Sequence, residues 1–418
     1  MLKILANAWK VPEIRKKLFY ILLILAIYRL GNYILLPGVD MVSYFASRQT
    51  ADAAQSFFNA IAGGGFASVF VLGIGPYITS SIIMQLLTVA IPKLEQIQKE
   101  GEEGRKKINQ YTRVVAVFLS LLQASGTVYT YNSYGLFTHR NFLVYGMAVL
   151  ALVAGSIFIM WLGELLTEKG IGNGSSFIIF ANILSGLPSA VSFFVIEGGT
   201  DVWKWILNVV VLALFVLVMA LVVWVQGGER RIPVQYSKKM VGRQMYGGQS
   251  SFIPIKVNIA GVMSIIFAIS LLQFPSVIAN FWRTDWLDAV VRNLEISAPI
   301  GGTLYVVLIF FFTFFYTSFA INPIEMAENM KKSGGFIPGI RPGKPTSDYI
   351  QKIIERLSWA GALFYAIIAM IPVLFQVVLG INVGFGGTTL LIVTGVALEL
   401  VKQLESQLLM RHYKGFLS

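Results

Sequence analysis

The sequence predicts an all-α integral membrane protein with ten transmembrane helices in two inverted five-helix halves. Three observations lead to this fold class. Of the 418 residues, 56% are apolar and 13% are charged, whereas a soluble domain carries roughly 25% charged residues. Ten apolar stretches approach or exceed the length of about 20 residues that a helix needs to cross a bilayer. Lys and Arg gather in alternate connecting segments, which is typical of cytoplasmic loops.

The predicted spans follow one another along the whole chain. The first, 18–36, comes after Lys16 and Lys17 and has 19 residues, longer than the roughly 7–15 residues of a cleaved signal's apolar region. We therefore interpret it as a retained span. The last is the shortest. The ten stretches are 18–36, 69–91, 114–131, 142–162, 176–194, 206–225, 259–281, 303–321, 357–379 and 385–401.

The positive charges fix the orientation of the spans. With the N-terminus inside, the inside segments hold 27 Lys and Arg and the outside segments hold 5. This bias places both termini in the cytoplasm. Three inside segments, 92–113, 226–258 and 322–356, are long and basic. We interpret them as a platform for a partner, the alternative being inert solvated loops.

Ten spans divide into an N-terminal half, 1–200, and a C-terminal half, 201–418. Five spans per half is an odd number, so the halves have opposite orientations in the membrane. If they are homologous, a pseudo-two-fold axis in the membrane plane relates them, with a pathway at their interface. No matching repeat is visible in the sequence, and the chain is otherwise expected to form a single membrane domain over 1–418.

An apolar segment at 56–68 lies outside, directly before the second span, and is too short to cross the bilayer. Gly63, Gly64 and Gly65 give it a flexible break, because glycine has no Cβ to restrict its backbone. Irregular backbone at membrane depth is tolerated only inside protein or against a water-filled cavity. The segment is therefore either a half-helix that folds back into a cavity or an amphipathic segment at the membrane surface.

Several kinds of functional site are missing from the sequence. No Asp or Glu lies in the middle of a span, although proton and cation transporters usually need one there. The chain has no cysteine, two histidines on opposite sides of the membrane, and no Walker A loop. The glycine-rich stretch 170–174 lies in a cytoplasmic loop without the strand of a nucleotide site. We expect no enzyme activity, metal or cofactor.

Motifs from the second span to the last occur in an order that resembles the bacterial branch of the SecY/Sec61 family. Each motif alone is weakly specific, but together they cover nearly the whole chain. They lie at 73–78, 81–87, 100–108, 110–113, 161–164, 170–174, 258–262, 331–334, 338–343 and 385–393.

This resemblance implies an hourglass pore between the halves, with an apolar ring at its waist and a short re-entrant plug helix. An apolar constriction excludes water and ions but can deform around a passing chain. For each isoleucine the alternative is lipid contact or core packing. Carried onto this sequence, the ring is Ile74, Ile78, Ile179, Ile266 and Ile392, with Ser175 where the family often has an aliphatic residue. The plug is Phe57, Phe58, Asn59, Ala60, Ile61, Ala62, Gly63, Gly64 and Gly65.

The resemblance also implies a lateral gate between the second and seventh spans, with Thr79, Gln85 and Asn258 as its polar cluster. Ordinary interhelical hydrogen bonding is the alternative for each of these residues. The basic loops resemble docking sites for a SecA-like motor ATPase and for the ribosome. The docking residues are Lys106, Lys107, Arg243 and Arg341. SecE-like and SecG-like small membrane subunits are implied by the family alone.

The function implied by the resemblance is that of the central subunit of the Sec translocase in the bacterial plasma membrane. Such a passive channel passes unfolded secretory polypeptides and signal peptides, releases transmembrane segments into lipid, and is driven by a motor ATPase or the ribosome. The alternative is a secondary transporter of a small solute, which would show saturable flux rather than an ion leak after plug deletion. A membrane-embedded hydrolase needs a catalytic dyad that the sequence lacks.

Overall fold

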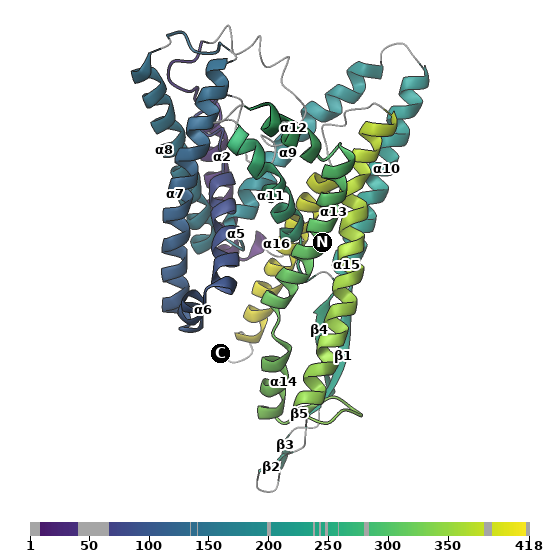
Figure 1. Ribbon diagram of the computed structural model, residues 1–418. Coiled ribbons are helices and arrows are strands. Elements are labelled where there is room, and N and C mark those ends of the chain that lie inside the picture. The colour runs from purple at the N-terminus through teal and green to yellow at the C-terminus, as the bar shows by residue number, and fades with distance from the viewer. Residues whose placement is uncertain are drawn as a thin grey trace. The chain divides into compact units, whose positions relative to one another are not determined.

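The computed structural model describes residues 9–40, 67–133, 135–139, 141–198, 202–236, 239–241, 244–246, 250–257, 259–279, 284–379 and 387–414. The described chain is mostly helical, and each of the ten predicted stretches overlaps one of its α-helices (Figure 1). In chain order these helices are α2 (Pro12–Gly31), α5 (Gly75–Ala90), α7 (Glu102–Ser133), α8 (Phe142–Lys169), α9 (Gly174–Gly198), α10 (Val202–Gly227), α11 (Met263–Ala279), α13 (Pro299–Ala320), α15 (Lys344–Leu379) and α16 (Gly387–Lys414).

The observed helices differ from the predicted spans mainly at their ends. Helices α7, α15 and α16 extend well beyond the apolar stretches, into sequence rich in Glu, Lys, Gln and Leu. These residues favour helix regardless of polarity, so the helix continues where the apolar run stops. Helix α5 begins six residues later than predicted, because residues 67–74 form turns and Pro76 occupies the first turn of the helix.

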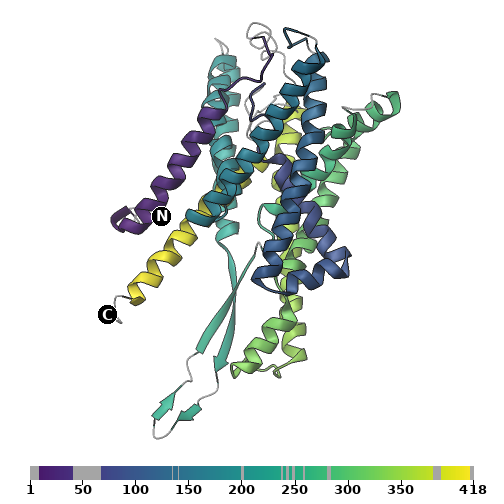
Figure 2. The ribbon, with the colours of Figure 1, turned by 90° about the vertical axis from the view of Figure 1, so that its left-hand side faces the viewer.

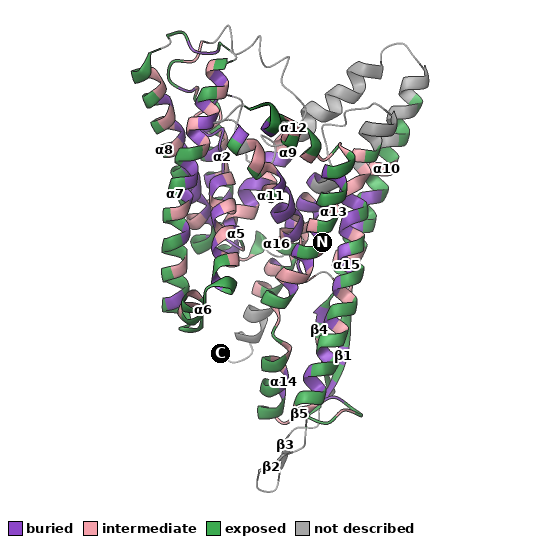
Figure 3. Ribbon diagram, in the orientation of Figure 1, coloured by how far each residue is buried: buried purple, intermediate pink, exposed green. Residues whose placement is uncertain are grey.

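Four helical segments of the described chain are long and apolar enough to cross a membrane. They are α7, α8, Pro299–Lys332, which contains α13 and α14 (Pro323–Lys332), and Lys344–Ile371 of α15. Helix α5 and α6 (Pro92–Lys99) form a further candidate that bends by 102° at its break. Several large apolar side chains of α8 are exposed, among them Phe142 at 85%, and Figure 3 marks exposed residues along this helix in green. A large apolar surface of this kind is typical of a face that contacts a membrane or another protein. That each of the ten spans crosses a membrane stays a prediction.

The chain forms two compact units, each described by itself. The first comprises Met1–Asn208, Gln273–Asn293 and Gly380–Ser418, and the second comprises Val209–Leu272 and Leu294–Leu379. In the first unit α8 packs against α2, α7 and α9, while α5 packs against α7 and α9 packs against α16. Helix α12 (Asp285–Leu294) follows α11. The predicted division into 1–200 and 201–418 stays a prediction.

The second unit folds two of the predicted cytoplasmic loops into one small subdomain. Strands β1 (Glu229–Tyr236) and β4 (Ser250–Lys256) form an antiparallel ribbon in which Ile232 pairs with Ile253. Strand β5 (Gly335–Phe336) extends the sheet in the order β4-β1-β5, and β2 (Lys239–Val241) pairs with β3 (Gln244–Tyr246) at the tip (Figure 2). Helices α14 and α15 complete this subdomain. Its apolar core is Ile232, Val234, Ile255, Met330, Ile337, Ile350 and Ile354.

Candidate pore, gate and docking sites

The segment that enters α5 is held tightly by its neighbours. The backbone N–H of Ala67 donates to the Tyr131 hydroxyl at 3.1 Å, and the Ala67 carbonyl accepts from the Leu36 N–H at 2.9 Å. Ala67 is fully buried and has a φ of 55°, a left-handed conformation that costs energy for any residue with a Cβ. The predicted plug, Phe57 to Gly65, precedes this segment and lies outside the described residues.

The N-terminal end of α5 places Ile74 against α8 in the first unit. Ile74 is 1% exposed, while Ile78, one turn on, is half-buried. Gly163 of α8 makes room for Ile74, because a Cβ added at Gly163 would lie 3.3 Å from Ile74 Cδ1 and 3.7 Å from Ser175 Oγ. Two predicted pore residues, Ile74 and Ser175, therefore approach the same point on α8.

The other predicted ring residues are also buried in protein. Ile179 in α9 is 3% exposed and Ile392 in α16 is 1% exposed, and these two helices pack together in the first unit. Ile266 in α11 is 7% exposed and belongs to the second unit. None of these three side chains faces lipid, which removes one of the two alternatives weighed from the sequence. The closure of the ring across the two units stays a prediction.

The predicted gate residues in α5 bond within their own helix. Thr79 Oγ1 donates to the Gly75 carbonyl at 3.1 Å, and Gln85 Nε2 donates to Ser81 Oγ at 3.2 Å. Gln85 Oε1 is buried and accepts no hydrogen bond from the described part of the chain. A buried acceptor without a donor is costly, so this amide is suited to a bond with a further group. Asn258 lies outside the described residues.

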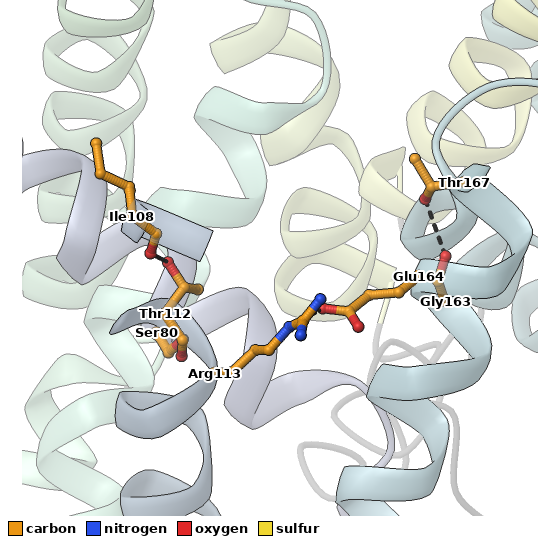
Figure 4. Close-up of polar contacts among 7 residues, drawn as sticks. All are labelled: Ser80, Ile108, Thr112, Arg113, Gly163, Glu164 and Thr167. Carbon is orange, nitrogen blue, oxygen red and sulfur yellow. Dashed lines mark hydrogen bonds and ion pairs between the residues drawn. The ribbon is translucent and has the colours of Figure 1, made fainter. Parts of the chain in front are cut away.

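Two polar contacts fix α7 between α5 and α8 (Figure 4). Neither contact is evident from the sequence. Ser80 Oγ donates to the Thr112 carbonyl at 2.6 Å, and both residues are buried. Arg113 Nε donates to Glu164 Oε1 at 2.7 Å in an ion pair that is partly exposed to solvent. The signal in the sequence for this pair is that Arg113 and Glu164 lie at the ends of consecutive predicted spans that are predicted to face the same side.

Three of the four predicted docking residues lie in the described part of the chain. Arg341 is exposed in the turn between β5 and α15, where its carbonyl accepts from Thr346 Oγ1 at 2.9 Å. Lys106 is exposed near the start of α7, whereas Lys107 Nζ lies 3.2 Å from Glu100 Oε2 and is partly neutralised. Arg243 lies outside the described residues. The small core of Ile232 and its neighbours holds the Arg341 turn on a folded support rather than a free loop.

Comparison with solved structures defines the class of fold. A structure of a protein-conducting channel matches with a TM-score of 0.61 at 19% identity, over 93% of this chain and 91% of that chain. Sec61 in the canine ribosome–channel complex matches with a TM-score of 0.57 at 18% identity, over the same shares. The idle yeast Ssh1 complex on the 80S ribosome matches with a TM-score of 0.64 at 15% identity, over 94% and 89%. The chain therefore has the fold of the SecY/Sec61 channels.

Sequence comparison defines the family. A family model described as SecY matches residues 68–401. The protein translocase subunit SecY of Streptomyces scabiei is 45% identical over 437 residues, covering 100% of both chains. Its counterpart in Aquifex aeolicus is 41% identical over 438 residues, covering 100% of this chain and 99% of the relative. The chain belongs to the SecY family, and the resemblance drawn from its motifs is confirmed.

Proposed function

We propose that this chain is the channel subunit of a protein translocase, which passes unfolded polypeptides across the plasma membrane and releases transmembrane segments sideways into lipid. The observation that carries the proposal is the 45% identity over the full length to a protein translocase subunit. The structure adds that Ile74, Ile179, Ile266 and Ile392 are at most 7% exposed although the helices around them expose many apolar side chains. Nothing in the comparisons supports a small-solute transporter.

The proposed constriction works by a general property of apolar side chains. Isoleucines at a narrow point exclude water and ions, because a narrow apolar pore loses its water. They also bind no particular side chain, so the constriction can accept polypeptides of any sequence. Gln85, with its unused buried carbonyl, would take part in the lateral gate together with Thr79 and Asn258. When a signal helix enters the gate, it breaks hydrogen bonds between the gate helices. Each broken bond costs about 0.6–2 kcal/mol, and the binding of the signal helix can supply this free energy.

The driving force comes from a partner in this proposal. A SecA-like motor or the ribosome would bind at Arg341, Arg243 and Lys106. The arginine guanidinium groups can form two hydrogen bonds to one carboxylate or phosphate, and the lysine ammonium group attracts the same groups by its charge. Small SecE-like and SecG-like membrane subunits would complete the complex. Two of the similar solved structures are of ribosome-bound channels, which supports the ribosome as a partner. Both termini would lie in the cytoplasm of a bacterial cell, as the positive charges predict.

Crosslinking tests the proposed path of the polypeptide. The chain contains no cysteine, so a single cysteine at Ile78, Ile179 or Ile392 would be the only thiol. A stalled secretory chain with a thiol-reactive probe should crosslink to all three positions. Leu150→Cys is the control, because Leu150 lies on the outer face of α8 and is 67% exposed. Crosslinking at Leu150 that equals crosslinking at the three isoleucine positions would contradict the proposal.

A further inference from the structure

The glycine-rich turn at Gly170–Gly174, between α8 and α9, is fixed to α8 by a chain of hydrogen bonds. The Gly170 N–H donates to the Leu166 carbonyl at 3.0 Å. The Gly174 N–H donates to Thr167 Oγ1 at 2.9 Å. Thr167 Oγ1 in turn donates to the Gly163 carbonyl at 2.9 Å, as Figure 4 shows. A Cβ added at Gly174 would overlap the Gly163 carbonyl oxygen. The first turn of α9 thus lies in direct contact with the backbone of α8.

The opposite side of the same turn meets α16. Gly172 has a φ of 87°, which favours glycine, and a Cβ added there would overlap Gln403 Oε1 and lie 3.0 Å from Gln403 Cδ. Gln403 Nε2 donates to Glu399 Oε1 at 3.2 Å, one turn earlier in α16, which holds the amide in place. The neighbouring side chains Ile171 and Leu404 are 1% and 0% exposed. The turn is therefore packed between α8 and the cytoplasmic part of α16.

Helix geometry connects this contact to the proposed constriction. Gln403 follows Ile392 by 11 residues in the same continuous helix, α16. At 3.6 residues a turn, 11 residues is about three turns, so both side chains lie on one face of α16, about 16 Å apart along its axis. Ile179 lies in the second turn of α9, which starts in the glycine turn. The contact between Gly172 and Gln403 thus joins the start of α9, which carries Ile179, to the helix that carries Ile392.

We propose that the turn Gly170–Gly174 is the fixed point that positions α9 and α16, and that Gln403 is a positioning residue for the closed constriction. This inference rests on the proposed function, because it assigns Ile179 and Ile392 to the constriction. Without the Gln403 contact, α16 still packs against α9 but loses its contact with the glycine turn, and the closed channel leaks ions more often. A merely structural turn would lower stability without changing the conductance of the folded channel.

Conductance of the closed channel in planar bilayers tests the proposal. Gln403→Ala should raise the ion leak of the resting channel by roughly three- to tenfold, the population shift expected for loss of one interhelical contact. Gln407→Ala is the matched control, since it removes the same side chain one turn further along α16. An equal leak from both variants would overturn the positioning role.

A third variant separates this inference from the proposed function. Ile392→Ala shortens a constriction side chain directly, so it should leak if the proposed function holds. If Ile392→Ala leaks ions and Gln403→Ala does not, the positioning role of Gln403 is overturned and the proposed constriction stands. A tight channel in both overturns the proposed constriction and the inference with it.

Gly172→Ala tests the same contact from the turn. The added methyl group collides with the Gln403 amide, so this variant should leak more than Gln403→Ala. Combining Gly172→Ala with Gln403→Ala removes the collision but leaves the backbone strain of alanine at a φ of 87°, so the leak should fall below that of Gly172→Ala. A double variant that leaks as much as Gly172→Ala alone would place the effect in the backbone and overturn the proposed contact. If Gly172→Ala does not fold, the comparison of Gln403→Ala with Gln407→Ala decides.

Discussion

At the scale of single residues, polar side chains between membrane helices contribute little energy each, but they define which surfaces meet. Ser80 illustrates this, because its Oγ reaches from α5 to the Thr112 carbonyl in α7 at 2.6 Å and is fully buried. The Arg113–Glu164 pair between α7 and α8 has a similar role, but it is partly exposed. Ion pairs of this kind stabilise a fold by about 0–1 kcal/mol, so we assign it to alignment rather than stability.

Removal of the Ser80 hydroxyl should have a measurable cost. We expect Ser80→Ala to lower the free energy of unfolding by about 0.6–2 kcal/mol, the range measured for hydrogen bonds between membrane helices. Thermal unfolding in detergent micelles would measure it. Ser125→Ala is the control, since the Ser125 hydroxyl donates to Leu121 in its own helix. An equal loss of stability in both variants would contradict a role for Ser80 between helices.

At the scale of elements, small residues determine how closely the segments of the first unit approach. Gly155 of α8 lies directly against the chain that enters α5, and a Cβ added there would overlap the Val69 carbonyl oxygen. Small residues allow such approaches between helices in membranes. Gly146 lies in the same helix, and a Cβ added there would have no atom within 4 Å. Substitution of Gly155 therefore reports on packing, whereas substitution of Gly146 reports on helix preference alone.

The two alanine substitutions should have opposite effects on stability. We expect Gly155→Ala to destabilise the protein by about 1–3 kcal/mol, the cost typical of overpacking. Gly146→Ala should be neutral or stabilising by up to about 1 kcal/mol, because alanine has the higher helix preference. The measurement is again thermal unfolding in micelles. A neutral Gly155→Ala variant would show that the entry segment can move away from α8 at no cost.

The subdomain of the second unit that contains β1 and β4 has its own apolar core. Ile350 of α15 is 0% exposed and packs with Ile232 and Ile255 of the β1–β4 ribbon. We expect Ile350→Ala to weaken this core by about 2–5 kcal/mol. Hydrogen exchange of the β1 amides should accelerate accordingly. Ile324→Ala is the control because Ile324 is 63% exposed, and accelerated exchange in both variants would contradict the assignment of this core.

At the scale of the whole molecule, the proposed function requires that a passive channel receive force from a partner at its cytoplasmic surface. Arg341 is exposed beside the folded support of the β1–β4 ribbon and α14. A guanidinium held in that position can make bidentate bonds to carboxylates or phosphates. The site is thus suited to a partner that presents acidic groups.

Charge reversal at Arg341 should uncouple the channel from the proposed motor partner without unfolding the channel. We expect Arg341→Glu to reduce ATP-driven translocation by at least about tenfold, since loss of one buried charged contact costs about 2–5 kcal/mol at an interface. Translocation into vesicles measures the effect. Arg356→Glu makes the same change in net charge at an exposed position of α15 and should translocate nearly normally. Equal impairment of both variants would indicate a general charge effect.

Much of the fold was predictable from the sequence because a bilayer imposes a simple rule. A helix that crosses hydrocarbon must be apolar for about 20 residues, so the ten stretches found by composition each overlap an observed helix. The rule fails where the chain leaves the bilayer. The sequence predicts segments 226–258 and 322–356 to be long basic loops that serve as a platform for a partner, but it does not reveal that they contain strands β1 and β4 and the core around Ile350. Their apolar residues are too scattered in the sequence to reveal which of them meet.

The sequence by itself determined the membrane class and the family, and it predicts the orientation, because hydrophobicity, charge bias and motifs are read along the chain and need no contacts. Only the tertiary structure decided that Ile74, Ile179, Ile266 and Ile392 are buried rather than lipid-facing. It alone also showed that Gly163 receives Ile74 and that Gly172 meets Gln403. The physical reason is that isoleucine and glycine occur in membrane helices both where they face lipid and where they face protein, so the residue type does not tell which of the two applies. Their roles depend on which helix lies opposite, and packing between helices distant in sequence sets that.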